Sequence, residues 1–348
     1  MNWLIYGANG YTGELIARQA KKQGLQPILA GRNKAAVNAL ATELGLEARI
    51  FSLDTPEAII RELENCKLAL HCAGPFSATS EPMIEACLAS GAHYLDITGE
   101  ISVFQHAHEQ SERARRADVV LIPGVGFDVV PSDCLAATLV NALPAATQLS
   151  LAFEAGGGPS PGTAKSGMEG LSQGGCIRRD GELVHVPLAW KTKKIPFAHS
   201  ERMAVTIPWG DVFTAHVSTG IPNIEVYMSM SPASIANMRR MRWVQPLLGL
   251  GMVQSLAKKV IEGRVQGPAE SSRENSRSEL WGEAITSDGR CAAATMSTPN
   301  GYDLTVSASL GITQFLLEND VEGGYYTPSL LMGADYAGSL PGVVLNLL

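Results

Sequence analysis

The chain has 348 residues, of which 45% are hydrophobic and 18% charged, and its formal net charge is −7. This length suits two domains, and the composition is typical of a globular protein. The acidic balance, without a cluster of basic and aromatic side chains, disfavours a nucleic-acid partner. The most apolar helical stretch, residues 244–257, is too short and interrupted to span a bilayer, and the first strand begins too early for a secretory signal to precede it.

The cysteines and histidines indicate no metal or redox centre. None of the six cysteines lies in a C-x-x-C pair, and the seven histidines form no ligand cluster. Scattered free cysteines are typical of a reducing compartment, so we expect a cytoplasmic protein without a bound metal.

The chain opens on a predicted dinucleotide site. Residues 3–6 form an apolar run typical of a buried parallel strand, and three glycines follow at a spacing of three. Gly7 allows a sharp turn, Gly10 lets the backbone approach a pyrophosphate, and Gly13 lets the helix predicted over 14–23 pack close to the sheet. The pyrophosphate would then lie at a helix N-terminus. The alternative is a glycine-rich turn without a ligand.

The second strand, predicted over 25–30, indicates which dinucleotide binds. NAD sites usually place Asp or Glu after this strand, whereas this chain has Arg32 and Asn33. A guanidinium can pair bidentately with a 2′-phosphate and stack on adenine. We therefore expect NADP, with NAD as the alternative. Arg32 could instead be a solvated surface side chain, and Asn33 could cap the helix predicted over 34–44.

Strands and helices alternate up to about residue 130, which predicts a doubly wound parallel sheet of the Rossmann type. The further strands are expected over 48–52, 68–72, 93–97 and 119–123, and the helices over 55–65, 80–90 and 103–117. Such sheets bind ligands at the carboxyl ends of their strands. Small residues and turn formers at five of these ends leave room for a dinucleotide. The expected cofactor contacts are Gly7, Asn9, Gly10, Tyr11, Thr12, Gly13, Arg32, Asn33, Ala73, Gly74, Pro75 and Phe76.

The pattern changes after residue 130 and predicts a second, α+β domain on a mostly antiparallel mixed sheet. Helices are expected over 131–143, 163–171, 232–262 and 301–317, strands over 148–154, 204–208, 213–217 and 224–231, and a hairpin over 278–297 with an Asp-Gly turn. We expect a nucleotide domain over 1–130, a substrate or oligomerisation domain over 131–320, and a helical tail over 321–348 that returns to the first domain.

Several segments together resemble the saccharopine-dehydrogenase-like oxidoreductases. They are GANGYTG at 7–13, LAGRN at 29–33, CAGPF at 72–76, AHYLDITGE at 92–100 and GVGFDVVPSD at 124–133, with looser similarity at 207–211 and 219–223. The resemblance implies an NAD(P)-binding Rossmann domain, a second domain that covers the nicotinamide, and a nicotinamide-dependent oxidoreductase. It does not imply saccharopine as substrate, because the Gly-Tyr-Thr-Gly and Thr-Gly-Glu segments are closer to the unassigned and trans-acting enoyl-reductase-like branch.

The candidate catalytic groups follow two later strands. A Tyr-x-x-x-Lys pair, which short-chain dehydrogenases use, is absent, because none of the eight tyrosines has Lys four residues on. Glu100 and Asp128 are the candidates for proton transfer, with Asp96 and Thr98 beside them in sequence. The alternative is structural, since such side chains also cap loops and helices through backbone amides.

The sequence leaves the substrate open. A small or lipid-like molecule is expected, and Lys165, Trp209 and Asp211 are candidates to line its cleft. The rival hypothesis is a non-catalytic NADP-binding regulator or scaffold, because no recognisable acid–base pair is present. The stretch 238–256 is expected to be a core helix, with a membrane-surface or oligomer face as the alternative. Stable membrane contact is not expected, and a homodimer is compatible with the sequence.

Overall fold

The computed structural model describes the chain except at residues 1, 157, 161, 163, 165, 166, 169, 171–173, 244 and 246–266. Lys165, most of the helix expected over 163–171 and most of 244–262 therefore lie outside the described residues. The chain forms two units, which are treated separately below. The first unit comprises residues 1–128 and 304–328, and the second comprises 129–303 and 329–348.

The first unit is built on a parallel sheet, as the sequence predicts. Its seven strands lie in the order β15-β6-β5-β4-β1-β2-β3, and all neighbouring pairs are parallel. The chain order reverses at β1, which lies between β2 and β4, so the topological switch point falls at the carboxyl end of β1. The strands are β1 (Asn2–Tyr6), β2 (Ile28–Gly31), β3 (Ala48–Ile50), β4 (Cys66–His71), β5 (His93–Asp96), β6 (Val120–Ile122) and β15 (Gly324–Tyr325).

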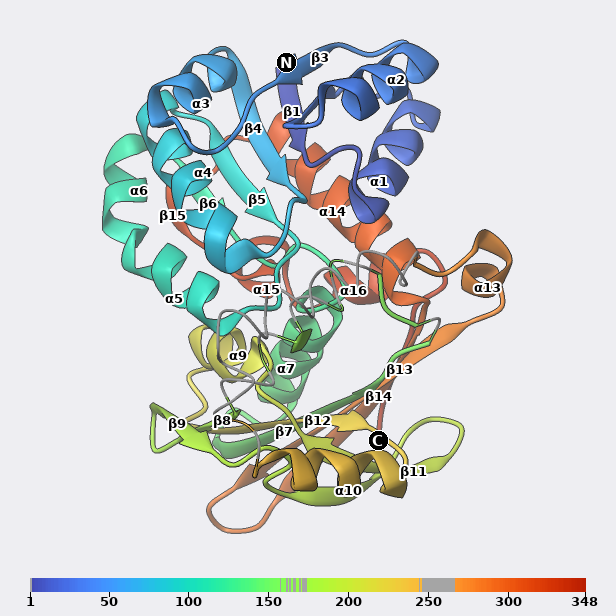
Figure 1. The fold of residues 1–348 in the computed structure, drawn as a ribbon. Coiled ribbons are helices and arrows are strands. Elements are labelled where there is room, and N and C mark those ends of the chain that lie inside the picture. The colour runs from blue at the N-terminus through green and yellow to red at the C-terminus, as the bar shows by residue number, and fades with distance from the viewer. Residues whose placement is uncertain are drawn as a thin grey trace. The chain divides into compact units, whose positions relative to one another are not determined.

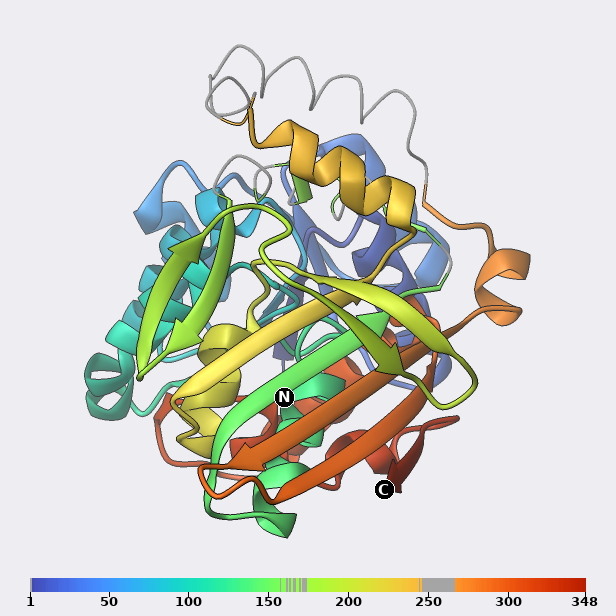
Figure 2. The same cartoon turned by 90° about the horizontal axis from the view of Figure 1, so that it is seen from below.

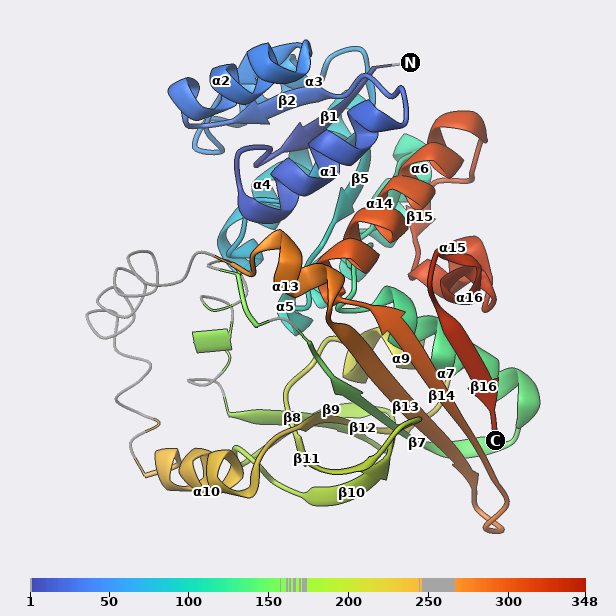
Figure 3. The same cartoon turned by 90° about the vertical axis from the view of Figure 1, so that its right-hand side faces the viewer.

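Helices cover both faces of this sheet (Figures 1 and 3). Leu4, Ile5, Leu29, Leu68 and Leu70 have no exposed surface, which explains the continuous apolar runs in these strands. One face carries α1 (Tyr11–Lys22), α2 (Lys34–Leu44) and α14 (Gly301–Glu318), and the other carries α3 (Pro56–Leu63), α4 (Phe76–Ser90), α5 (Ile101–Glu109) and α6 (Ser111–Ala117).

The helix expected over 103–117 is divided in two. Gln110 ends α5 and begins α6, and its backbone N–H donates to the carbonyls of His106 and Ala107. The apolar spacing continues across this break, so the periodicity alone does not reveal it.

The second unit is built on a mixed sheet, also as predicted. Its main path is β10-β11-β12-β7-β13-β14-β16, with β8 and β9 attached beside β12, and among these pairs only β12 and β7 are parallel. The strands are β7 (Ala146–Glu154), β8 (Gly175–Arg179), β9 (Glu182–Val186), β10 (Thr192–Pro196), β11 (Glu201–Thr206), β12 (Asn223–Ser229), β13 (Arg277–Thr286), β14 (Cys291–Pro299) and β16 (Val344–Leu347).

Helices lie on opposite faces of the second sheet (Figures 2 and 3). One face carries α7 (Val130–Ala142), whose Leu135 and Leu139 lie against Gly282 of β13, and α9 (Asp211–Thr219). The other face carries α10 (Pro232–Met241), whose Ile235 packs on Val205 of β11. The remaining short helices are α13 (Glu270–Glu274), α15 (Pro328–Met332) and α16 (Tyr336–Ser339). No helix in the described ranges is long and apolar enough to cross a membrane.

The strand expected over 213–217 is wrong, because this segment belongs to α9. The buried residues are Asp211, Val212, Thr214 and Ala215, a helical spacing rather than the alternation expected of a strand. Gly220 ends the helix in the left-handed conformation, at φ 72°. The apolar run alone could not distinguish a short helix from a strand.

The hairpin of β8 and β9 was not expected. Asp180 and Gly181 form its turn with φ of 51° and 86°, and an Asp-Gly pair is a strong hairpin signal. The second hairpin, β13 and β14, is confirmed, with Ile285 opposite Cys291.

The units differ from the expected boundaries at 130 and 320. Most of α14 and all of β15 belong to the first unit, because β15 pairs with β6 at the edge of the parallel sheet. The tail beyond residue 328 belongs to the second unit, where β16 pairs with β14. The tail is thus part helix and part strand, whereas the sequence favoured helix.

Lys67 of β4 secures the end of α14 across 250 residues of sequence. Its Nζ donates to the carbonyls of Leu317 and Asn319, both at 3.3 Å, and lies 3.7 Å from Asp320 Oδ1. A cation at a helix C-terminus satisfies unpaired carbonyls and complements the helix dipole.

We predict that Lys67→Met lowers the free energy of unfolding by about 1–2 kcal/mol. Thermal unfolding followed by circular dichroism measures the loss. Lys22→Met, at the exposed end of α1, is the control, and equal effects would contradict this role.

Candidate dinucleotide-binding site

The glycine-rich loop lies at the switch point and is tightly packed on its inner side. Gly7 has φ 79°, and a Cβ there would lie 2.8 Å from the backbone nitrogen of Ala73 at the end of β4. A Cβ on Gly13 would lie 2.3 Å from the carbonyl oxygen of Gly7. Both glycines are therefore required by the close approach of β1, β4 and α1.

Gly10 differs from the other two glycines. A Cβ on this residue would meet the carbonyl oxygen of Gly7 at 3.2 Å and no other atom within 4 Å among the described residues. The loop is thus open on its outer side, where a pyrophosphate would need room. Tyr11 and Thr12, the first residues of α1, are both half-buried here.

Asn9 connects this loop with β2. A Cβ on Gly31 would lie 3.1 Å from the Asn9 Oδ1 atom and 3.2 Å from the Cγ2 atom of Val37 in α2. Gly31 therefore lets the Asn9 side chain pack over the end of β2. This contact places the glycine-rich loop beside Arg32, the next residue along the chain.

Arg32 and Asn33 have different environments. Asn33 caps α2, because its Oδ1 accepts from the backbone N–H of Ala36 at 3.2 Å. Arg32 is exposed, and its side chain has no hydrogen bond or ion pair within the described part of the chain. It lies close enough to Tyr6 for its charge to oppose the effect of burial, which raises the pKa of that phenol to about 12.

The segment after β4 is held by the half-buried Thr79 and the buried His71. Thr79 Oγ1 donates to the carbonyls of Ala73 at 2.7 Å and Pro75 at 3.0 Å. His71 Nε2 lies 3.0 Å from the same hydroxyl, and because that hydroxyl has one hydrogen, His71 is the donor. Burial lowers the pKa of His71 to about 3, so the ring is neutral at physiological pH. Neither residue is predicted from the sequence, where the only signal is a histidine at the end of an apolar strand.

Asp96 joins the ends of β5 and β6. Its carboxylate accepts from Tyr94 Oη at 2.6 Å and from the backbone N–H groups of Thr98 at 2.9 Å and Gly124 at 2.8 Å. Burial raises its pKa to about 7, against the lowering effect of these three donors. Asp96 is fully buried and serves as a hub of backbone contacts.

Glu100 contacts the helix that follows β4. Its Oε1 accepts from the N–H of Phe76 at 3.1 Å, and its Oε2 accepts from the N–H of Ser77 at 2.7 Å. The backbone N–H of Glu100 donates to Thr98 Oγ1 at 3.0 Å. The first turn of α4 therefore lies beside the loop after β5.

Asp128 lies beside this loop. Its Oδ2 would be 3.0 Å from a Cβ on Gly99, so Gly99 makes room for the carboxylate. Burial, and then the negative charge of Glu100, raise the pKa of Asp128 to about 7. The neighbouring Phe127 donates its N–H to Thr305 Oγ1 at 2.9 Å, which fixes the backbone here. A raised pKa in such a setting makes Asp128 a candidate for proton transfer.

The candidates of the second unit do not form a comparable cluster. Trp209 packs against the Phe153 ring at 4.9 Å between centroids, and Asp211 is buried at the start of α9. Three arginines of this unit each have a separate partner: Arg178 donates to the Val212 carbonyl at 2.7 Å, Arg202 lies 3.6 Å from Glu154, and Arg242 donates to the Leu188 carbonyl at 2.6 Å.

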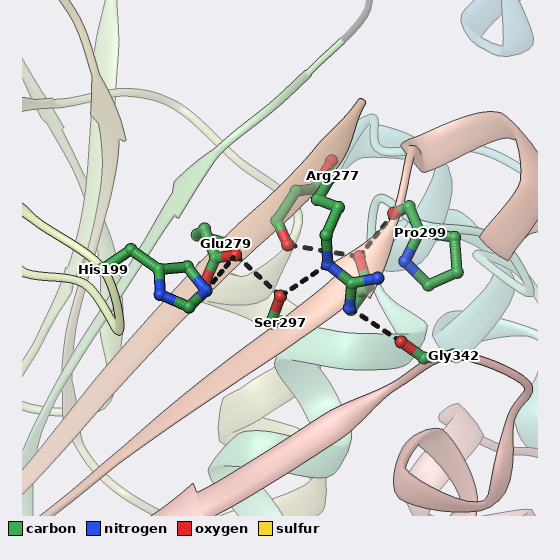
Figure 4. A network of polar contacts seen from close by, with 8 residues as sticks. His199, Arg277, Glu279, Ser297, Pro299 and Gly342 are labelled. Carbon is green, nitrogen blue, oxygen red and sulfur yellow. Dashed lines mark hydrogen bonds and ion pairs between the residues drawn. The ribbon is translucent and has the colours of Figure 1, made fainter. Parts of the chain in front are cut away.

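Figure 4 shows a polar network on the second sheet. Arg277 Nε donates to Ser297 Oγ at 3.0 Å, and that hydroxyl donates to Glu279 Oε1 at 2.7 Å. Arg277 Nη2 also donates to the Gly342 carbonyl at 2.8 Å, and His199 lies 3.8 Å from Glu279. The network joins β13 and β14 to the segment before β16, which is a structural role.

Gly13→Ala tests the close packing of the loop. The added methyl group overlaps the Gly7 carbonyl, which is backbone and cannot move aside cheaply, so we expect a loss of about 1–3 kcal/mol of stability. Gly338→Ala, on α16, meets no atom within 4 Å and is the matched control. Thermal unfolding of both variants measures the difference, and a Gly13→Ala variant as stable as Gly338→Ala would refute the packing argument.

The raised pKa of Asp128 predicts a pH-dependent stability. The folded state binds a proton more tightly than the unfolded state, so the stabilisation is complete below about pH 3.9 and is lost as the pH rises through about 7. Asp128→Asn should therefore gain about 1–2 kcal/mol relative to wild type between about pH 5 and about pH 8. Thermal unfolding at both pH values measures this, with the exposed Asp118→Asn as control. A pH-independent difference would contradict the assignment.

Comparisons with known proteins agree with the fold and the loop. Residues 3–122 match the family model of the saccharopine dehydrogenase NADP binding domain. A Mus musculus saccharopine dehydrogenase-like oxidoreductase is 26% identical over 152 residues, covering 37% of this chain and 35% of that protein. A Mycobacterium tuberculosis protein named as a trans-acting enoyl reductase is 28% identical over 147 residues, covering 40% and 35%. The matches thus span about a third of the length of these relatives.

Solved structures extend the similarity of fold to the whole chain. Saccharopine dehydrogenase (L-Glu forming) from Saccharomyces cerevisiae has a TM-score of 0.67 at 12% identity, covering 100% of this chain and 99% of that one. Homospermidine synthase from Legionella pneumophila, in complex with NAD, has a TM-score of 0.68 at 11% identity, covering 99% and 91%. At these low identities, the TM-scores show a shared fold and nothing more. Residues 3–122 thus match the nucleotide-binding domain of the saccharopine dehydrogenase family, as the sequence predicts, and the similarity of the rest of the chain is one of fold.

Proposed function

We propose that the protein is an NADP-dependent oxidoreductase that transfers hydride to or from a small or lipid-like substrate. The observation that carries the proposal is the exposed Arg32 guanidinium, without an ion pair in the described part of the chain, at the end of β2. Arg32 lies beside the glycine-rich loop, because Asn9 of that loop packs against Gly31, the preceding residue. An unpaired guanidinium beside an open anion-binding loop suits a 2′-phosphate.

The rest of the cofactor would lie along the carboxyl edge of the sheet. The open side of Gly10 suits the pyrophosphate, and the exposed Gly74 offers backbone surface beyond the switch point. Tyr11, Thr12, Asn33 and the 73–76 segment complete the proposed contacts. When bound, the dinucleotide supplies the hydride chemistry, and the protein supplies position and a proton route.

Asp128 is the proposed proton-transfer group. A carboxyl group with a pKa near 7 can both release and accept a proton at physiological pH. In the reductive direction, the Asp128 carboxyl would give its proton to the substrate atom that gains negative charge, and solvent would reprotonate the resulting carboxylate; the hydride itself is what the dinucleotide would supply when bound. Glu100 is assigned a different role below.

The oligomeric state and the cellular location remain predictions. A homodimer and a cytoplasmic location are expected from the sequence, although one relative, from Arabidopsis thaliana and 32% identical over 150 residues, is named as mitochondrial.

Arg32→Ala tests the cofactor assignment. Loss of a charge-assisted contact to the 2′-phosphate should weaken NADPH binding by about tenfold or more, while NADH binding changes little. Titration of the nicotinamide fluorescence with each dinucleotide measures both affinities, with the exposed Arg116→Ala as the matched control. Equal losses for NADPH and NADH would remove the phosphate assignment.

Wild-type protein that binds neither dinucleotide would refute the proposed function. Binding without turnover on imines, ketones and enoyl thioesters would favour the rival hypothesis of a non-catalytic regulator or scaffold.

A further inference from the structure

The first turn of α4 has no cap of its own. Its N-cap residue, Pro75, makes no side-chain cap, so the first N–H groups of the helix need another acceptor. Glu100 supplies it from the next loop, with one carboxylate oxygen on Phe76 N–H and the other on Ser77 N–H. A negative charge at this position also complements the dipole of α4.

Glu100 caps α4 and does not cap α5, the helix that it precedes. It is the N-cap residue of α5, yet its side chain makes no cap there. Glutamate is a poor N-cap residue, because its longer side chain does not fold back as Ser, Thr, Asp or Asn does. Its carboxylate is instead directed to the neighbouring helix. The geometry is thus a cap between two helices rather than within one.

A series of hydrogen bonds holds the backbone at Glu100. Asp96 Oδ1 accepts from Thr98 N–H at 2.9 Å, and Thr98 Oγ1 accepts from Glu100 N–H at 3.0 Å. Asp96 is anchored in turn by Gly124 N–H of the loop after β6. Because Asp96 and Thr98 are fully buried, the loop that carries Glu100 is fixed before any ligand arrives.

The segment that Glu100 holds is also attached at two other points. The Ala73 backbone lies against Gly7, and Thr79 Oγ1 binds the carbonyls of Ala73 and Pro75. These attachments surround Gly74, which is the exposed residue of the segment. The backbone at Gly74 is therefore held at a fixed position next to the glycine-rich loop.

We infer that Glu100 is a positioning residue for the dinucleotide and not a proton donor: it holds the first turn of α4 so that the segment 73–76 forms a rigid wall of the cofactor site. This inference rests on the proposed function. Pre-organisation of that wall increases affinity, because ordering it does not oppose binding. Both oxygens of Glu100 are engaged with backbone amides, which leaves proton transfer to Asp128.

The test combines affinity, local exchange and chemical rescue. Glu100→Ala should weaken NADPH binding by about tenfold and accelerate hydrogen exchange of the amides in 73–80. Millimolar formate, a carboxylate small enough to replace the deleted side chain, should restore both properties in Glu100→Ala and leave wild type unchanged. Glu100→Gln keeps one acceptor oxygen and should fall between, and it also serves if Glu100→Ala does not fold. Glu109→Gln, at the exposed far end of α5, is the matched control.

The outcomes separate this inference from the proposed function. Wild-type affinity and exchange in both Glu100 variants would overturn the inference while the proposed function stands. Weaker binding that formate does not restore, with exchange in 73–80 unchanged, would also overturn it. Absence of NADPH binding by wild-type protein would remove the proposed function and the cofactor role of Glu100 together, even if formate still slowed exchange in Glu100→Ala.

Discussion

The close approach of β1, β4 and α1 at the switch point is the constraint on which the rest of the nucleotide unit depends. Gly7 and Gly13 have no room for a side chain, and the atoms that exclude it are backbone atoms. The loop between them is consequently shaped before a ligand binds. Gly10 differs because its outer side is open, and that difference gives the loop a surface on which a phosphate could lie.

Hydrogen bonds between loops extend this order along the carboxyl edge of the sheet. Asp96 ties the end of β5 to Gly124 after β6, and Glu100 ties the loop after β5 to the first turn of α4. Thr79 of α4 binds the carbonyls of the same segment, and His71 of β4 contacts the Thr79 hydroxyl. The proposed cofactor wall is therefore a set of loops held by buried and half-buried polar side chains, most of which bond backbone groups.

The sequence predicted the first unit well because its signals are local. Apolar runs separated by helical patterns, and glycines at fixed spacing, indicate a Rossmann sheet without reference to distant residues. The second unit was harder, since a short apolar run fits either a strand or a helix; α9 was misassigned for that reason. The addition of β15 and β16 to two different sheets depends on pairing across long sequence separations, which no local pattern encodes.

By itself the sequence determined the fold class, the glycine-rich loop and the position of Arg32 after the second strand, since each depends on neighbours in the chain. Only the tertiary structure separated Glu100 from Asp128. Both are carboxylates after a strand, and their environments differ in what lies across from them: two helix amides for Glu100, and a half-buried setting beside Gly99 for Asp128. The sequence gives the type of each side chain, but folding decides its hydrogen-bond partners and its solvation.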